Sequence, residues 1–252
     1  MLIQPILEKL RQMKLLGLAE AFSSQSQQVD VQGLSFEERF GLLVDQEWAY
    51  RQDRRLARLL KEARLRLPAC PEDIDYQSPR GLDRAVMRAL AGGQWLRARQ
   101  NVLIVGPTGA GKTFIACALA NAACRQGFAA RYFRVPRLLS DLAIARGDGS
   151  YPRLLAKLAR IDLLVLDDWA IAPFSPADCR EILEVIEDRC QTKSTMIASQ
   201  LPVDDWHAAI GDPTVADAIL DRLVHNAHKI ILRGESMRKV KKDPPPIDTG
   251  EE

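Results

Sequence analysis

Apolar residues recur at helical spacing through the first part of the chain, where successive apolar positions lie three or four residues apart. In the first such segment these positions are Ile3, Ile6, Leu7, Leu10, Met13 and Leu18. A polar stretch rich in Ser and Gln, residues 23–28, is predicted to end this helix. Ser35, with acidic residues in the following turn, is typical of the start of a second helix, which is predicted to run to Leu67. Residues 1–67 are therefore expected to form an N-terminal helical domain.

From Asn101 onward, short apolar runs alternate with segments of helical periodicity. The helices predicted between these runs are residues 114–127, 136–146 and 179–191. The apolar runs, predicted as strands, are residues 101–106, 129–135, 161–168, 194–200 and 229–234. Strands that are apolar at nearly every position are typical of a parallel sheet covered on both faces. The predicted fold class is α/β, with a parallel sheet sandwiched by helices.

Two changes in composition divide the chain further. A proline-bearing segment, residues 68–80, is predicted to link the helical domain to the α/β domain, which is expected to span residues 81–242. After residue 242 the chain is rich in proline and charge, so residues 243–252 are expected to be disordered.

Charge and hydropathy leave most partners open but argue against a membrane. The 252 residues carry a formal net charge of +2, which by itself neither favours nor excludes nucleic acid. The chain has no apolar run long enough to cross a bilayer, and its N-terminal segment has charges among the apolar residues, unlike a signal peptide. The five cysteines lack Cys-x-x-Cys spacing and are expected to be reduced thiols. These features predict a cytoplasmic protein.

A loop between a predicted strand and a predicted helix matches the phosphate-binding pattern G-x-x-x-x-G-K-[ST] at every fixed position. Its glycines allow the backbone to curl so that successive N–H groups point at phosphate oxygens. Its lysine places a positive charge against the β- and γ-phosphates, and its final hydroxyl is suited to Mg²⁺. The loop predicts that the cofactors are ATP and Mg²⁺. It consists of Gly106, Pro107, Thr108, Gly109, Ala110, Gly111, Lys112 and Thr113.

Two carboxylates, Asp167 and Asp168, end the predicted strand 161–168. Asp167 is expected to complete the Mg²⁺ site with Thr113. This order of motifs resembles the AAA+ class of P-loop NTPases, in most of which the second residue is a glutamate that orients the attacking water. Asp168 is one methylene shorter, which predicts an ATPase whose hydrolysis is slow.

The AAA+ resemblance implies three further contacts to the nucleotide. The predicted strand 194–200 ends in Ser199 and Gln200, and either side chain could be the sensor that hydrogen-bonds the γ-phosphate or the lytic water. Arg222 corresponds in order to the finger that reaches the neighbouring subunit's phosphates, and Arg238 to the second sensor over its own nucleotide. An arginine supplied by the neighbouring subunit would make ATP hydrolysis depend on oligomerisation. The alternative for each arginine is a solvated surface charge.

Three longer stretches resemble the IstB-type transposition helper ATPases, which are related to the DnaC helicase loader. They lie at residues 74–113, 163–176 and 199–239, and the most specific parts are LPVDDWH, ADAILDRL and GESMRK. The resemblance covers nearly the whole chain. It implies a bacterial protein, encoded with a transposase in an insertion sequence, that assembles with ATP into homo-oligomers on double-stranded DNA without sequence preference. It further implies that the protein recruits and stimulates the cognate transposase.

A cationic stripe in the second predicted helix is the candidate DNA contact. Residues three and four apart share one face of a helix, and such a face suits a phosphate backbone. The stripe consists of Arg51, Arg54, Arg55, Arg58 and Lys61, and a second patch consists of Arg238, Lys239, Lys241 and Lys242. A solvated helix face or a protein contact is the alternative for the stripe. Aromatic residues are few, which favours duplex DNA over stacking of single strands.

Two other functions remain compatible with the sequence. A replicative helicase loader would share the ATPase core, grip a helicase with its N-terminal region and prefer single-stranded DNA. A scaffold that binds ATP without hydrolysing it would be consistent with Asp168. The N-terminal helical domain is the candidate contact for the transposase.

Overall fold

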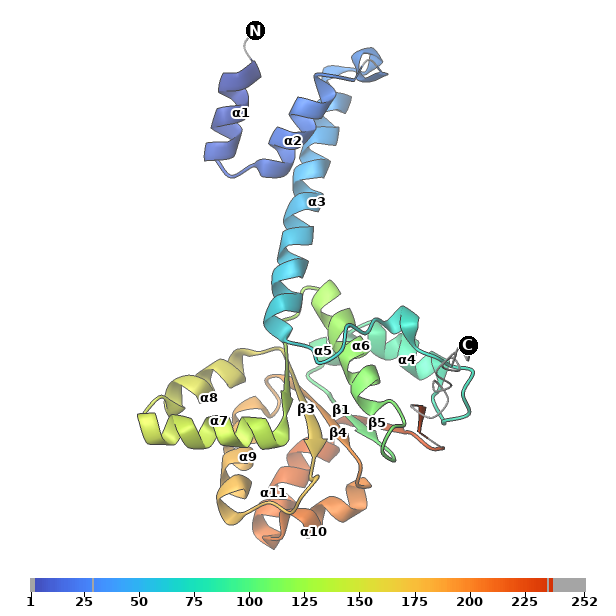
Figure 1. Ribbon diagram of the computed structural model, residues 1–252, viewed down its shortest axis with the longest axis vertical. Coiled ribbons are helices and arrows are strands. Elements are labelled where there is room, and N and C mark those ends of the chain that lie inside the picture. The colour runs from blue at the N-terminus through green and yellow to red at the C-terminus, as the bar shows by residue number, and fades with distance from the viewer. Residues whose placement is uncertain (1–2, 29, 235, 238–252) are drawn as a thin grey trace, which may run out of the picture. The chain divides into compact units, whose positions relative to one another are not determined.

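The computed structural model describes residues 3–28, 30–234 and 236–237, and the chain folds into two compact units, Met1–Leu59 and Leu60–Glu252 (Figure 1). The division falls inside a long helix, before the domain end proposed at residue 67. Residues 68–80, proposed as a linker, pack within the second unit, where Ala69, Ile74 and Arg80 are buried.

The first unit contains α1 (Ile3–Gln12), α2 (Leu16–Gln25), η1 (Asp30–Gly33) and most of α3 (Phe36–Ala63). The start of α3 is as predicted: the Ser35 hydroxyl accepts a hydrogen bond from the Glu38 N–H at 3.2 Å, and the Glu38 carboxylate accepts one from the Ser35 N–H at 2.8 Å. This reciprocal pair satisfies two N–H groups that the helix itself leaves without acceptors.

The prediction of a single helix through Leu18 is wrong, because the chain turns at Lys14, which has a φ of 60°. Tertiary contacts between α2 and α3 account for the break. A Cβ atom on Gly17 would lie 2.6 Å from the Tyr50 Cβ, so α2 approaches α3 closely at this glycine. The Glu47 carboxylate of α3 also accepts a hydrogen bond from the Leu18 N–H at 3.0 Å. A straight helix from residue 3 onward would not allow both contacts.

The end predicted for α3 at Leu67 is also wrong, since the helix ends at Ala63. Arg64 adopts a left-handed conformation with a φ of 49°, which terminates the helix. Pro68 restricts only the residue before it. The early end allows Arg66 and Leu67 to line a pocket in the second unit.

A five-stranded parallel sheet forms the centre of the second unit, which confirms the predicted α/β class. Its order is β2-β3-β4-β1-β5, and every neighbouring pair is parallel. The strands are β1 (Asn101–Val105), β2 (Ala130–Arg134), β3 (Leu163–Trp169), β4 (Ser194–Ser199) and β5 (Ala227–Ile231). Because all strands are parallel, the loops that follow them lie at one edge of the sheet, where α/β proteins bind their ligands.

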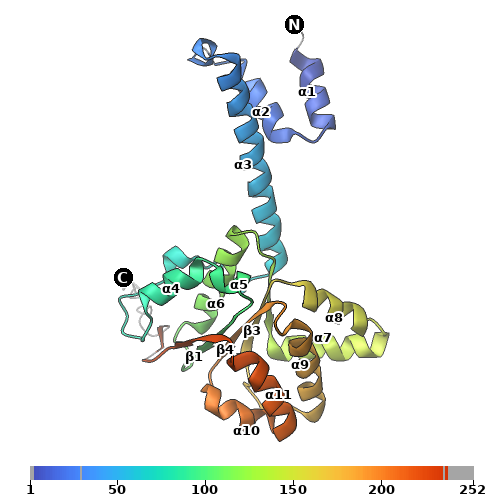
Figure 2. The ribbon, with the colours of Figure 1, turned by 180° about the vertical axis from the view of Figure 1, so that it is seen from behind.

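Helices cover both faces of this sheet (Figures 1 and 2). On one face lie α4 (Arg84–Ala91), α5 (Gln94–Arg97) and α6 (Lys112–Arg125). The main hydrophobic core lies on the other face, where side chains of β1, β3 and β4 pack against the remaining helices. These are α7 (Val135–Asp148), α8 (Tyr151–Arg160), α9 (Pro176–Arg189), α10 (Trp206–Ile210) and α11 (Pro213–Val224). The second unit also contains two short 3-10 helices, η2 (Pro71–Asp73) and η3 (Val203–Asp205).

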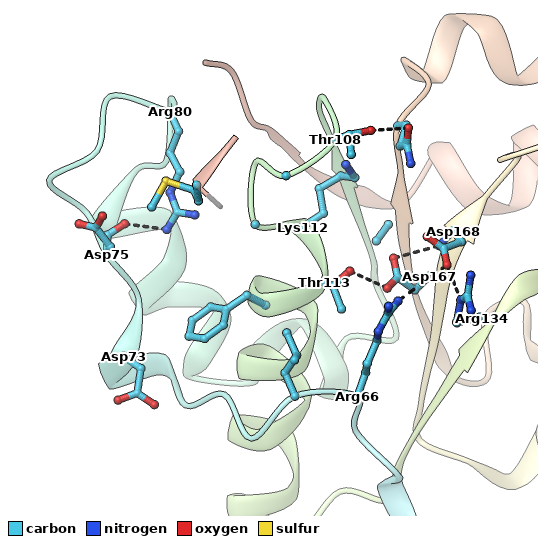
Figure 3. Close-up of a pocket in the computed structure, with 17 residues that line it drawn as sticks. Arg66, Asp73, Asp75, Arg80, Thr108, Lys112, Thr113, Arg134, Asp167 and Asp168 are labelled. Atoms are coloured by element: carbon cyan, nitrogen blue, oxygen red, sulfur yellow. Dashed lines mark hydrogen bonds and ion pairs between the residues drawn. The ribbon is translucent and has the colours of Figure 1, made fainter. Parts of the chain in front are cut away.

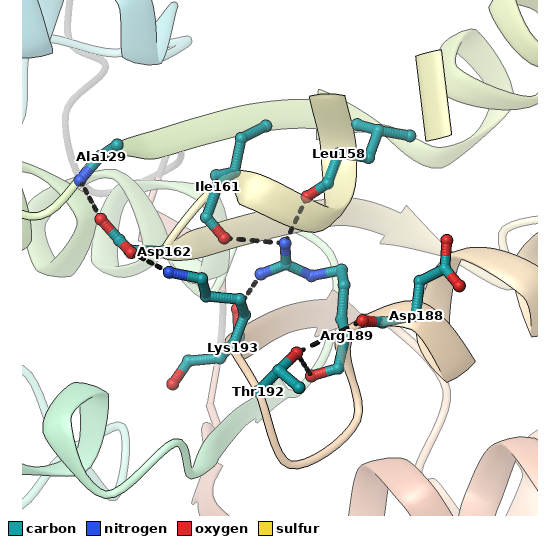
Figure 4. Close-up of polar contacts among 9 residues, drawn as sticks. Ala129, Leu158, Ile161, Asp162, Asp188, Arg189, Thr192 and Lys193 are labelled. Atoms are coloured by element: carbon teal, nitrogen blue, oxygen red, sulfur yellow. Dashed lines mark hydrogen bonds and ion pairs between the residues drawn. The ribbon is translucent and has the colours of Figure 1, made fainter. Parts of the chain in front are cut away.

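A buried arginine, Arg189, ties together the amino ends of the strands (Figure 4). It is 1% exposed, and its guanidinium donates to the carbonyls of Leu158, Ile161 and Ser194. Burial lowers the pKa of Arg189 to about 9. Beside it the Asp162 carboxylate pairs with the Lys193 ammonium at 2.5 Å. This network fixes the edge of the sheet opposite the P-loop.

Candidate active site

The glycine-rich loop joins β1 to α6 and opens into a pocket of about 710 Å³, a size suited to a small-molecule ligand (Figure 3). Gly111 immediately precedes α6 with a φ of 95°, and a Cβ there would lie 2.5 Å from an Arg80 guanidinium nitrogen. At Gly106, with a φ of 154°, a Cβ would lie 2.6 Å from the Leu232 carbonyl oxygen. The loop therefore requires glycine at both positions, and its backbone is free to wrap around phosphates.

Lys112 lies inside this loop and is only 8% exposed. Its ammonium donates to the carbonyl oxygens of Gly106 and Pro107, at 2.8 Å each. Burial lowers the pKa of Lys112, whereas the nearby charges of Asp167 and Asp168 act in the opposite direction. A buried ammonium among carbonyl groups is suited to anionic oxygens that enter the loop, because these are stronger acceptors.

Asp167, near the end of β3, is 2% exposed, and both of its carboxylate oxygens accept hydrogen bonds. One carboxylate oxygen accepts hydrogen bonds from the Thr113 hydroxyl at 2.7 Å and the Tyr132 hydroxyl at 2.6 Å. The other accepts from the Asp168 N–H at 2.9 Å. Burial, followed by the hydrogen bond to Asp167, raises the pKa of Tyr132. The buried carboxylate and the adjacent hydroxyl form an oxygen donor set that fits Mg²⁺.

Asp168 also faces the pocket but is paired with arginine. One of its carboxylate oxygens lies 2.5 Å from the Arg134 Nε and 3.9 Å from an Arg66 nitrogen. The backbone of Asp168 is left-handed, with a φ of 57°, which is uncommon outside glycine. Both arginine contacts are made to the same carboxylate oxygen.

Residues from before β1 form the opposite wall of the pocket (Figure 3). Arg80 is 5% exposed and donates to the Ala110 carbonyl at 3.1 Å and to the Asp75 carbonyl at 2.7 Å. Its Nε finds no hydrogen-bond partner among the residues that the structure describes. The lining of the pocket also includes Leu67, Asp73, Asp75, Phe114 and Met237. This mixed apolar and acidic surface is suited to the base and sugar of a nucleotide.

Of the two sensor candidates, only Gln200 lines the pocket. Its side-chain oxygen accepts a hydrogen bond from the Thr108 hydroxyl at 2.7 Å, which leaves the amide hydrogens to act as donors. Ser199 is 0% exposed, and its hydroxyl donates to the Trp169 carbonyl at 3.0 Å while accepting from the Leu201 N–H at 3.1 Å. We therefore assign the first sensor to Gln200 and expect Ser199 to stabilise the fold.

Replacing Gln200 with alanine is expected to lower ATP turnover by at least about 10-fold with little change in stability, because one donor to the transition state is lost. The matched variant, Ser199→Ala, should instead lower the free energy of unfolding by about 1–3 kcal/mol, since it leaves buried polar groups without partners. Turnover per folded molecule and thermal unfolding, measured for both variants, test the assignment. Reduced turnover in folded Ser199→Ala, with normal turnover in Gln200→Ala, would instead assign the sensor to Ser199.

Arg222 lies away from the pocket of its own subunit. Its carbonyl accepts a hydrogen bond from the Asn101 side chain at 3.1 Å, and Asn101 begins the strand that ends at the P-loop. The guanidinium donates to the Glu187 carboxylate at 3.0 Å and to the Ala218 carbonyl at 2.8 Å. Arg222 thus sits at the edge of the sheet opposite its own nucleotide site.

The cationic stripe on α3 is exposed along its length. Arg51 pairs with Glu47 at 2.6 Å, and the Arg54 guanidinium lies 5.8 Å from the centroid of the Tyr50 ring. The second patch, Arg238, Lys239, Lys241 and Lys242, lies outside the described residues. The chain just before it reaches the P-loop, because the Met237 N–H donates to the Gly109 carbonyl at 3.0 Å.

The polar side chains of the site that sequence reasoning missed include Arg66, Arg80, Tyr132 and Arg134. They come from segments whose approach to the P-loop depends on the tertiary fold.

Across the described parts of the chain, no helix is both long and apolar enough to span a bilayer.

The chain matches the family of IstB-like ATP binding proteins over residues 8–244. The insertion sequence ATP-binding protein y4pL of Sinorhizobium fredii is 52% identical to it over 239 residues, which are 95% of this chain and 98% of that protein. An ATP-binding protein of insertion sequence IS21 from Pseudomonas aeruginosa is 31% identical over 229 residues, which are 91% of this chain and 86% of that protein.

Solved structures of replication proteins share the fold. The DnaC helicase loader superposes with a TM-score of 0.55 and 21% identity, covering 64% of this chain and 96% of that chain. DnaI gives a TM-score of 0.58 with 18% identity over 70% of this chain and 93% of that chain. DnaA from Aquifex aeolicus, bound to AMPPCP, gives a TM-score of 0.54 with 18% identity, covering 66% of this chain and 51% of that chain. These likenesses confirm the predicted AAA+ P-loop fold.

Proposed function

Because the chain belongs to the family of IstB-like ATP-binding proteins, we propose that it is an ATP-dependent DNA-binding helper for transposition. It assembles on duplex target DNA and recruits and stimulates the transposase encoded with it. The names of its relatives, which are ATP-binding proteins of insertion sequences, support the link to transposition. The cationic stripe on α3 is the observation that carries the DNA-binding part of the proposal.

The nucleotide site supports ATP hydrolysis as well as ATP binding. The P-loop N–H groups and Lys112 would hold the β- and γ-phosphates, and Thr113 and Asp167 would hold Mg²⁺. When bound, Mg²⁺ neutralises charge that develops on the phosphate oxygens. Asp168 accepts the proton of the attacking water, and Gln200 orients the γ-phosphate. The ion pair between Arg134 and Asp168 at 2.5 Å supports slow hydrolysis, because it engages the carboxylate proposed as the base.

Oligomerisation completes the site in this proposal. Arg222 lies at the edge of the sheet opposite its own P-loop, so it acts on the phosphates of a neighbouring subunit. Hydrolysis then depends on assembly, and bound ATP acts as a timer on the DNA-bound oligomer. Arg238 is proposed as the second sensor on the subunit's own nucleotide.

DNA binding by α3 is expected to be electrostatic. Each arginine or lysine that neutralises a phosphate contributes about 0.9 to the slope of log affinity against log salt concentration. Replacing Arg54 and Arg58 with alanine should therefore reduce that slope by about two and weaken duplex binding at low salt. A salt titration with a fluorescent duplex of arbitrary sequence measures both quantities.

A matched control is available on another helix. Arg84 and Arg88 of α4 have the same spacing and exposure, and Arg84 also stacks on a tyrosine ring, that of Tyr76, at 5.2 Å. Their replacement removes the same charge but should leave the salt slope unchanged. If both double variants lose affinity equally, the binding reflects net charge and the assignment to α3 fails.

A replicative helicase loader is the second candidate, supported by the fold shared with the DnaC helicase loader. The two functions differ in the DNA that they prefer. The transposition helper should bind duplex more tightly than single strands of equal length in the presence of ATP. Tighter single-strand binding would favour the loader.

A further inference from the structure

Arg80 is a buried arginine beside the P-loop, although arginine is almost never fully buried without a partner. Its guanidinium donates to two backbone carbonyls, those of Ala110 at 3.1 Å and Asp75 at 2.7 Å (Figure 3). The Asp75 carboxylate accepts instead from the Gln77 N–H and the Ser78 hydroxyl. The hydrogen bonds of this buried guanidinium therefore go to carbonyl groups, one of which belongs to the P-loop.

The backbone around Arg80 is anchored at the end of β5. The Arg80 carbonyl accepts a hydrogen bond from the Arg233 N–H at 2.9 Å, and the Arg80 N–H donates to the Ser78 carbonyl at 2.8 Å. Gly81 follows with a φ of 74°, and a Cβ there would lie 3.2 Å from the Ile231 carbonyl oxygen. Because β5 pairs with β1, the strand that leads into the P-loop, the guanidinium reaches the loop from a backbone that is fixed to the same sheet.

The hydrogen bond to the Ala110 carbonyl acts on the peptide between Ala110 and Gly111. This peptide is trans, and in a trans peptide the C=O and the following N–H point in opposite directions. With Arg80 on the carbonyl side, the Gly111 N–H points away from the guanidinium. Glycine imposes little backbone preference of its own, so a neighbouring group has to set the orientation of this peptide. The absent side chain also leaves room for that group, since a Cβ on Gly111 would lie 2.5 Å from an Arg80 nitrogen.

We propose that Arg80 is a positioning residue of the ATP site, which holds the Ala110–Gly111 peptide so that the Gly111 N–H is presented to the phosphates of the nucleotide. The proposal rests on the ATP-binding P-loop of the proposed function. Successive N–H groups bind an anion when their peptides share the required orientation. Arg80 thus connects the segment before α4 to phosphate binding.

The experiment measures how well ATP and inorganic triphosphate displace a fluorescent ATP analogue from the full chain without DNA. Arg80→Met keeps much of the side-chain volume and removes the donors. It should weaken ATP binding about 10-fold per folded molecule, the order of one hydrogen bond from an N–H group to a charged phosphate. Inorganic triphosphate should lose the same factor, because the proposed contact is to phosphate and involves neither base nor sugar. Arg80→Lys should recover only part of the loss, since an ammonium lacks the planar fork that spans two carbonyls.

Two controls separate positioning from loss of stability. Thermal unfolding without nucleotide gives the folded fraction of each variant. Arg84→Met removes the same charge at the start of α4, where the guanidinium lies 5.2 Å from the centroid of the Tyr76 ring, and it should bind both ligands as the wild type does. Should Arg80→Met not fold, Arg80→Lys takes its place and should lose affinity for both ligands by one smaller, equal factor.

An unchanged affinity of the folded Arg80 variant for triphosphate would overturn the proposal, because Arg80 would then have no role in phosphate binding. Full recovery in Arg80→Lys would also overturn it, since charge alone would account for the effect. The proposed function is judged from the wild type. Failure of the wild type to bind ATP would refute the nucleotide site itself, whereas normal binding by both the wild type and Arg80→Met would remove only the role of Arg80.

Discussion

Replacement of Lys112 with alanine should abolish ATP binding at ordinary concentrations and, with it, ATP-dependent assembly on DNA. The Lys112 ammonium lies within the loop, 2.8 Å from two carbonyl oxygens that phosphate oxygens would replace as acceptors. Charge-assisted contacts to phosphate are among the strongest hydrogen bonds in proteins. We expect affinity to fall at least about 100-fold, which corresponds to about 2.7 kcal/mol.

Titration with a fluorescent ATP analogue measures the loss, and light scattering with duplex DNA measures assembly. Lys157→Ala removes an exposed lysine of α8 and should behave as the wild type. Lys112→Arg keeps the positive charge, and thermal unfolding of both Lys112 variants reports any loss of stability. Assembly that still responds to ATP in folded Lys112→Ala would contradict the nucleotide switch.

The central sheet could be predicted from sequence because its strands are buried on both faces. β1 and β4 are buried at every position, and residues 102–105 and 196–198 within them are apolar. The P-loop could equally be predicted from the sequence, since its residues are contiguous and its glycines meet a local backbone requirement. The helix ends in the N-terminal region were different. The break at Lys14 and the end of α3 before Arg64 are each marked by a non-glycine residue in the left-handed conformation, which periodicity does not report.

The site was only half predictable for a related reason. Ser199 and Gln200 are adjacent polar residues, and the structure separates them by burial, which their types do not reveal. Arg134 pairs with Asp167 in the β2–β3 register, so a correct strand order would have indicated an arginine beside the acidic strand end. Arg66 had no such signal. The helix predicted to run to Leu67 placed Arg66 inside a helix rather than in the pocket lining.

Arg222→Ala should lower ATP turnover on the order of 10³-fold while leaving ATP binding unchanged, if Arg222 acts in trans as proposed. In the proposed assembly, the Arg222 of one subunit would stabilise the charge of the phosphoryl group transferred on its neighbour, because Arg222 lies at the far edge of the sheet from its own P-loop. Arg222→Lys distinguishes this role from the ion pair with Glu187. A lysine can retain the ion pair but lacks the planar fork of donors, so it should also be inactive.

Mixing two inactive variants provides the decisive test of a shared site. Lys112→Ala has an intact Arg222 but an empty nucleotide site, and Arg222→Ala has an intact nucleotide site but no finger. At an interface between them, the Lys112→Ala subunit supplies Arg222 to ATP held by its neighbour, so the mixture should regain turnover that neither variant shows alone. The regained rate should rise with total protein concentration, because it requires association. A mixture that stays inactive, although the two variants assemble together, would show that Arg222 does not act across the interface.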